Sequence, residues 1–194
     1  MGGETPTGVT GPSRIAAVLR EFLGPDDPLS GYAERLEDGR LRSNVRGFLT
    51  GSLDLAIRLP AAGAGSGPGG VADADQGTRY AVLDYKTNWL GEIDEPLTLD
   101  SYRPSLIAAE MQRRHYALQA LLYLVALHRF LRWRVPGPEP EGRLAGVVYL
   151  FLRGMNGPET PVEDGIRYGV FGWQPPPGLI PALSDALDGQ GDRR

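Results

Sequence analysis

Three charged side chains from two neighbouring segments could together carry out chemistry on a phosphate. Asp54 lies in an alternating segment, 48–57. Asp84 and Lys86 lie in a second one, 80–86, and project to the same side about 6.6 Å apart, at about 3.3 Å per residue of strand. If the two segments pair, all three charges meet on one face of a sheet. Two carboxylates that close repel one another unless a cation lies between them, and a divalent metal is the economical explanation.

Such a group of side chains suits the hydrolysis of a phosphodiester. Mg²⁺ would neutralise charge on the phosphate and lower the pKa of a bound water. Because Mg²⁺ keeps several waters, two carboxylates, a backbone carbonyl and the substrate phosphate suffice to bind it. We expect Asp54 and Asp84 as metal ligands, with the carbonyl of Tyr85 as a third. Lys86 would orient the attacking water or stabilise the developing negative charge. Surface charges on a half-buried sheet are the alternative that these residues leave open.

Composition narrows the class of protein. The chain has 194 residues, 41% of them hydrophobic and 23% charged, which is typical of one globular domain. A net charge of −4 argues against a generic nucleic-acid-binding surface but does not exclude a nuclease, whose acids are offset by metal. The absence of cysteine excludes disulfides, thiolate zinc sites and iron–sulfur clusters, and fits the reducing cytoplasm. No apolar run is long enough for a membrane span, so no membrane partner is expected.

Hydrophobic periodicity predicts one α/β domain over 14–187, between a disordered leader, 1–13, and a disordered tail, 188–194. Helices are expected at 14–23 with Ser13 as N-cap, around 29–36, from Pro104 to Arg134 with a break near 112–115, and at 178–187. Strands are expected at 45–59, 80–86, 144–152 and 166–171, the third being central because it is apolar throughout. The glycine-rich segment 61–77 is interpreted as a flexible loop between two antiparallel strands.

Longer runs of the chain resemble a known family. They are GFLTGSLDL at 47–55, LDYKTNWLG at 83–91, YALQALLYLVALHRFLR at 116–132 and GVVYLFLRGM at 146–155. In this order, over about residues 45 to 187, they closely resemble the C-terminal nuclease domain of RecB subunits of bacterial exodeoxyribonuclease V. The resemblance implies the restriction-endonuclease-like core of the PD-(D/E)xK superfamily, an α/β fold in which helices flank a small mixed sheet.

The resemblance also implies an activity. It is that of a DNA exonuclease and endonuclease that depends on Mg²⁺, with Mn²⁺ or Ca²⁺ able to substitute for binding, in a RecBCD-type helicase–nuclease. Such complexes act in double-strand-break repair and recombination. The implied partners are single-stranded DNA from an unwound duplex, RecC- and RecD-type subunits, and the RecB helicase region. Matched by motif, Asp54 and Asp84 resemble the family's metal ligands and Lys86 its catalytic lysine, and Gln119-x-x-x-Tyr123 resembles its Q-x-x-x-Y helix motif beside the site.

The chain departs from the family pattern, and the missing histidine and N-terminal region, with the apolar and aromatic content of 144–173, favour a second hypothesis. The family carries a histidine metal ligand, and often a glutamate, on helices before the first strand, whereas the first histidine here is His115. The helicase phosphate-binding loop is also absent, and a long glycine-rich segment replaces a short turn between the two acidic strands. The N-terminal helical part of the family domain is therefore expected to be missing. The alternative function is a non-catalytic, nuclease-like module that docks other subunits or holds DNA.

Residues outside the proposed site have two interpretations each. The arginines of the long helical region could track DNA phosphates or form a solvated face; they are Arg113, Arg114, Arg129, Arg132 and Arg134. Trp89 could stack on a base or pack against the sheet edge. His115 is interpreted as a helix-linking residue rather than a ligand, and His128 as structural or surface.

Overall fold

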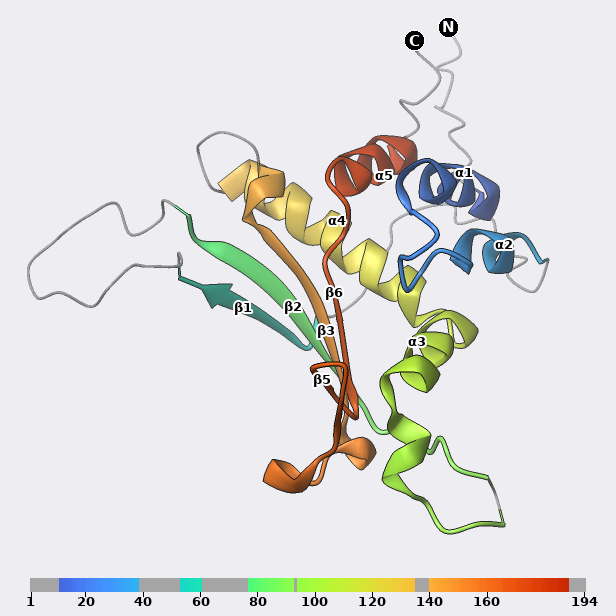
Figure 1. Cartoon of the computed structure of the whole chain (residues 1–194). Helices are drawn as coiled ribbons and strands as arrows, with labels where there is room; N and C mark the ends of the chain where they lie inside the picture. The colour runs from blue at the N-terminus through green and yellow to red at the C-terminus, as the bar shows by residue number, and fades with distance from the viewer. Residues whose placement is uncertain (1–10, 39–52, 61–76, 93, 135–139, 189–194) are drawn as a thin grey trace, which may run out of the picture.

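The computed structural model describes residues 11–38, 53–60, 77–92, 94–134 and 140–188, and their centre is a four-stranded sheet (Figure 1). The sheet order is β1 (Leu55–Leu59), β2 (Arg79–Lys86), β3 (Leu144–Phe151) and β6 (Val170–Trp173). β1 runs antiparallel to β2, β2 parallel to β3, and β3 antiparallel to β6. The predicted small mixed sheet, its antiparallel first pair and its central third strand are therefore confirmed.

The helices gather on one side of this sheet, as Figure 1 shows. They are α1 (Pro12–Phe22), α2 (Tyr32–Glu37), α3 (Pro104–Arg113), α4 (Tyr116–Arg134) and α5 (Leu179–Leu187). Short 3₁₀ turns lie at Leu99–Tyr102, Pro140–Arg143, Leu152–Gly154 and Gly157–Glu159, and a separate small ribbon pairs β4 (Val162–Glu163) with β5 (Ile166–Arg167). Within the described residues, no helix is both long and apolar enough to traverse a bilayer.

Helix α4 lies at the centre of the core. It is apolar on almost every side, and it packs against β3 on one side and α5 on another. Leu121, Leu124 and Leu131 are almost fully buried. The parallel pair β2–β3 needs a crossover between its strands, and α3 and α4 supply it. A helix buried in this way can present a polar side chain to the sheet, and Gln119 of α4 does so.

Several predicted boundaries are confirmed and others are wrong. The helical region from Pro104 does break where expected, at His115, whose φ is 57°. Ser13 is not an N-cap, because Pro12 occupies the first turn of α1 and Gly11 precedes it. The disordered leader was predicted to extend to residue 13, but helix α1 already begins at Pro12. Residues 1–10 of this leader lie outside the described residues. Helix α2 begins at Tyr32 rather than at position 29.

The predicted strand 166–171 is the third error. The chain turns at Tyr168 and Gly169, where the φ of Gly169 is 78°, so the segment divides between the ribbon strand β5 and the sheet strand β6. Asp54 was predicted to lie within the first strand, but β1 begins at Leu55 and Asp54 lies in a bend just before it. Residues 45–52 of that predicted strand lie outside the described residues, as do 61–76 of the predicted loop and 189–194 of the predicted tail.

A β-bulge in β3 decides which of its side chains face the helices. Tyr80 pairs with Leu144, but the next residue, Ala81, pairs with Gly146, so Ala145 is an extra residue in β3. Gly146 has a φ of 104°, a conformation that L side chains rarely adopt. Beyond the bulge, alternate residues of β3 share a face with those of β2: Val147 lies beside Val82, Tyr149 beside Asp84 and Phe151 beside Lys86. Without the extra residue, this set would point to the opposite face.

We predict that Gly146→Ala lowers the free energy of unfolding by about 2 kcal/mol, because alanine is strained at this φ and its Cβ would collide with the backbone oxygen of Trp173. Urea denaturation followed by circular dichroism measures the loss. Gly172→Ala on the neighbouring strand is the matched control, since its added Cβ meets no atom within 4 Å. Equal stability changes in the two variants would contradict a conformational requirement at Gly146.

Candidate functional site

The β1–β2 ladder brings two acids to one place. Its last pair is Leu55 with Leu83, and continuing this antiparallel register by one residue sets Asp54 opposite Asp84. Residues directly opposite each other share a face, with Cβ atoms about 5 Å apart. The Oδ2 atom of Asp54 accepts a hydrogen bond from the backbone N–H of Tyr85 at 3.3 Å. The two carboxylates therefore approach each other on the helix-covered side of the sheet, as the alternation of the two strands predicted.

The two acids differ in environment. Asp54 is exposed, whereas Asp84 is only 2% exposed. Burial raises the pKa of Asp84, the neighbouring Lys86 opposes this rise, and the charge of Asp54 adds to it, leaving a pKa above the ordinary value. A carboxylate held against this tendency gains from any additional cation beside it. Asp84 is accordingly the member of the pair whose charged form most needs a positive neighbour.

Lys86 supplies one such neighbour. Its ammonium group forms an ion pair with the Oδ2 atom of Asp84, and it donates a hydrogen bond to the Oε1 atom of Gln119 at 3.0 Å. Its side chain is 13% exposed. The same nitrogen lies 4.3 Å from the ring centroid of Tyr116 and 5.2 Å from that of Tyr149. The lysine is thus surrounded by one carboxylate, one amide and two aromatic rings, drawn from β2, α4 and β3.

Gln119 and Tyr123 form a connected pair beside this lysine. The Nε2 group of Gln119 donates to the hydroxyl of Tyr123 at 2.8 Å, one turn along α4. Its Oε1 atom accepts from both Lys86 and the hydroxyl of Tyr149, the latter at 3.3 Å. Two donors on one side determine which way the amide faces. The two helix residues predicted from the family motif therefore lie next to the predicted lysine.

Tyr116, Tyr149 and Asn88 belong to the same network and escaped the sequence analysis. The hydroxyl of Tyr116 donates to the Oδ1 atom of Asn88 at 3.1 Å. The one visible signal was a hydroxyl in the otherwise apolar strand β3, where Tyr149 is fully buried and a polar group must find a partner. No such indication exists in the sequence for Tyr116, because Tyr116 is the first residue of α4 and its direction depends on where that helix begins.

The oxygen donors present suit a hard divalent cation. Two carboxylates converge, and the peptide of Tyr85 adjoins one of them through its N–H. Mg²⁺ binds through one or two carboxylates and retains waters, so this donor set fits it without a histidine. Within the described residues, no three side chains of histidine, aspartate or glutamate gather at one point. The carbonyl of Tyr85 as a ligand stays a prediction.

The two histidines lie outside this cluster. The Nδ1 atom of His115 forms a hydrogen bond of 2.9 Å with the hydroxyl of Tyr32, and burial lowers the pKa of His115. His128 is 4% exposed on α4, and burial lowers its pKa too. Both geometries agree with the structural interpretation of these residues.

The arginines predicted to track phosphates are divided in their contacts. Arg113 and Arg114 both pair with the buried carboxylate of Glu110. Arg129 pairs with Asp188 and bonds to Ser184. Three of the five are therefore engaged within the protein.

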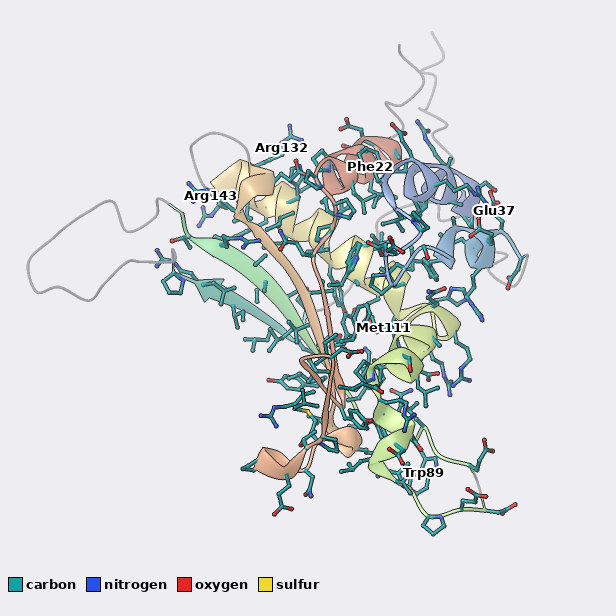
Figure 2. All side chains as sticks on the ribbon, in the orientation of Figure 1. Phe22, Glu37, Trp89, Met111, Arg132 and Arg143 are labelled. Carbon is teal, nitrogen blue, oxygen red and sulfur yellow. The ribbon has the colours of Figure 1, made fainter. Side chains whose placement is uncertain are left out.

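Trp89 and Arg132 are both exposed, but they lie at opposite ends of the molecule in Figure 2. The indole of Trp89 is 48% exposed, and its N–H donates to the carbonyl of Glu92 at 3.4 Å. The two residues do not form one continuous patch, and base stacking by Trp89 stays a prediction.

The chain is similar to part of a much longer protein. It is 45% identical over 179 residues to the RecBCD enzyme subunit RecB of Mycolicibacterium smegmatis, covering 92% of this chain and 15% of that protein. It is 45% identical over 175 residues to the protein of the same name from Mycobacterium tuberculosis, and 36% identical over 177 residues to that of Escherichia coli. These matches cover 90% and 91% of the chain, and 14% and 12% of the relatives. The chain thus spans about one seventh of their length. No family model matches it.

We predict that Asp54→Asn lowers the pKa of Asp84, because the substitution removes the neighbouring negative charge. A folded-state pKa above the unfolded value stabilises the fold at low pH, and this contribution is lost as pH rises through the folded pKa. The metal-free variant should therefore lose less stability than the parent between about pH 4 and neutrality.

Carbon-detected NMR titration of the aspartate carboxyls and urea unfolding in chelator measure the two effects. Asp100→Asn is the control, since that acid is exposed and pairs with Arg103. An unchanged Asp84 titration in Asp54→Asn would mean that the two carboxylates do not interact.

Proposed function

The chain belongs to the RecB family, and from this premise we propose that it is the Mg²⁺-dependent nuclease domain of a RecBCD-type helicase–nuclease. Its substrate would be single-stranded DNA released from an unwound duplex, cut as both exonuclease and endonuclease. The observation that carries the proposal is the juxtaposition of Asp54, just before β1, with Asp84 and Lys86 on β2, all three of which match the family's nuclease motif. The mixed sheet flanked by helices is consistent with a PD-(D/E)xK core.

In this proposal each residue has a distinct task. Asp54 and Asp84 would hold Mg²⁺ together with the carbonyl of Tyr85, and the ion would neutralise charge on the phosphate and lower the pKa of a bound water. Lys86 donates a hydrogen bond to the attacking water or to a phosphate oxygen as negative charge develops there. Gln119 restrains the ammonium group of Lys86 through its Oε1 atom, and Tyr123 restrains Gln119 in turn. Preorganised donors of this kind need no rearrangement at the moment of reaction.

The room beside these residues supports access by a nucleotide. A cavity of about 640 Å³ adjoins Gln119 and Tyr123 and extends along α4 past Leu118 and Leu122 to Arg129. Its apolar wall would contact a base or sugar, and Gln119, which lines it, also accepts a hydrogen bond from Lys86. We propose further that the longer protein joins this domain to a helicase region and to RecC- and RecD-type subunits, for repair and recombination at double-strand breaks.

We predict that Asp84→Ala and Lys86→Ala each reduce Mg²⁺-dependent cleavage of a single-stranded oligonucleotide by about a thousandfold, the loss typical of removing one group that stabilises a transition state. Gel analysis of an end-labelled oligonucleotide measures it. Asp100→Ala, an exposed acid outside the site, should cut at the parent rate. Undiminished cleavage by both site variants would refute the assignment of these residues.

Metal binding separates this function from a non-catalytic docking module. Isothermal titration calorimetry is expected to detect Mg²⁺ and Mn²⁺ in the parent and weaker binding in Asp54→Ala. Because the pKa of Asp84 is raised, protons should compete with the metal at higher pH than for an ordinary aspartate, so affinity should fall as pH is lowered toward that pKa. No heat from either metal, with both acids intact, would favour the docking module.

A further inference from the structure

Lys86 is the one lysine in the chain. The sequence contains 20 lysine and arginine residues, and all of them except Lys86 are arginines. Arginine carries a broad planar group with five donors, whereas lysine carries a compact ammonium with three. The single lysine of the chain thus lies at the proposed site, where its side chain is largely buried. This contrast indicates that the surroundings of residue 86 suit an ammonium group. Among the groups that contact it, the two aromatic rings have no role in the function proposed above.

Tyr116 and Tyr149 form two walls around the ammonium group. Their ring centroids lie 4.3 Å and 5.2 Å from the Nζ atom of Lys86. The rings themselves are near-parallel, with an interplanar angle of 23° and centroids 6.3 Å apart. A cation near the face of an aromatic ring is attracted by the ring quadrupole, and the attraction strengthens where water is excluded. At 13% exposure, the Lys86 side chain meets that condition.

Each ring is fixed by its own contacts. The hydroxyl of Tyr116 donates to Asn88, two residues after Lys86, and the ring also lies 6.4 Å from that of Phe151. Tyr149 is fully buried, and its hydroxyl donates to Gln119. Burial and the nearby acids raise the pKa of Tyr149, so this hydroxyl keeps its proton and remains a donor. The bulge at Gly146 turns Tyr149 toward Lys86 rather than toward the other face of the sheet.

We propose that Tyr116 and Tyr149 are positioning residues that direct Lys86 at the scissile phosphate. Asp84 and Gln119 take two of the three ammonium hydrogens, and the two rings restrict rotation and displacement of the group. One hydrogen thereby remains for the substrate in a defined direction. The inference rests on the nuclease function proposed above, but the geometry of the two walls is testable without it.

The first test is spectroscopic and independent of cleavage. Lysine labelled with ¹³C and ¹⁵N at its ε and ζ positions gives a single set of signals, because the chain has one lysine. Ring currents should shift the ε-methylene protons of Lys86 upfield of their position in the urea-unfolded chain. Tyr116→Leu and Tyr149→Leu should each remove part of this shift, whereas the two Tyr→Phe variants should retain it. A parent signal at the unfolded position would overturn the proposal.

The second test is kinetic. Both leucine variants are expected to reduce kcat for a single-stranded oligonucleotide by about tenfold or more with KM little changed, since the rings act on the catalytic group and not on DNA. Phenylalanine at position 116 or 149 keeps the ring, and kcat should stay within about fivefold of the parent. Lys86→Arg should not restore activity despite its charge, because a broad planar group cannot reproduce the contacts that the compact ammonium makes with both rings and with Gln119.

Phe171→Leu serves as the matched control. Phe171 is a buried aromatic residue that pairs with Tyr149 in the sheet and lies on the same face, one strand farther from Lys86. A fall in kcat in Phe171→Leu equal to that in Tyr149→Leu, at equal loss of unfolding free energy, would overturn positioning in favour of a structural role. Upfield lysine signals in a parent chain that cuts no DNA would refute the nuclease function while leaving the two walls intact. Cleavage without those signals would refute the walls alone.

Discussion

The site depends on holding a positive charge beside a buried carboxylate. Asp84 lies inside the protein with its pKa raised by burial and by Asp54, and Lys86 is the cation that offsets this cost. Removing one member of a buried pair leaves an uncompensated charge, which is far more costly than removing both. The lysine two residues later therefore stabilises the charged form of the acid that β2 presents to this face. Everything around the pair either excludes water from it or restrains it.

The network around Lys86 joins elements that are distant in the chain. Tyr116 and Gln119 come from α4, Tyr149 from β3 and Asp54 from the edge of β1. The buried hydroxyl of Tyr149 and the amide of Gln119 both have hydrogen-bond partners, and the carboxylate of Asp84 has an ion pair with Lys86, as a low-dielectric site requires. Because the partners belong to different elements, the network also ties α4 to the sheet. The same contacts thus fix the position of the Lys86 ammonium group and hold α4 against the sheet.

Two features cost stability and concern the site. Asp54 and Asp84 repel each other across the ladder, and Gly146 adopts a backbone conformation that weakens a strand. Natural proteins accept such local conflicts mainly where function needs them. The first conflict creates a place for a cation, and the second turns Tyr149 toward the lysine. Most of the other residues of α4 and β3 are apolar, and many of them are buried.

Local pattern alone was enough for the order of the main elements, the antiparallel pairing of the first two strands, and the shared face of Asp84 and Lys86. These follow from side-chain periodicity, which a short segment expresses by itself. The helix pair Gln119 and Tyr123 followed from spacing and from family resemblance. Local pattern was wrong at Ser13 and over 166–171, where a proline start and a glycine turn outweighed the hydrophobic signal.

The tertiary structure decided the rest, above all which residues of β3 face Lys86. In an apolar strand such as Leu144–Phe151, no alternation of polar and apolar residues distinguishes the two faces, so its sequence does not predict which face carries Tyr149. That depends on one extra residue at the bulge, and on a register set by pairing with a strand about sixty positions earlier. Periodicity is a property of neighbours along the chain, whereas register is a property of strands that meet only in the folded protein.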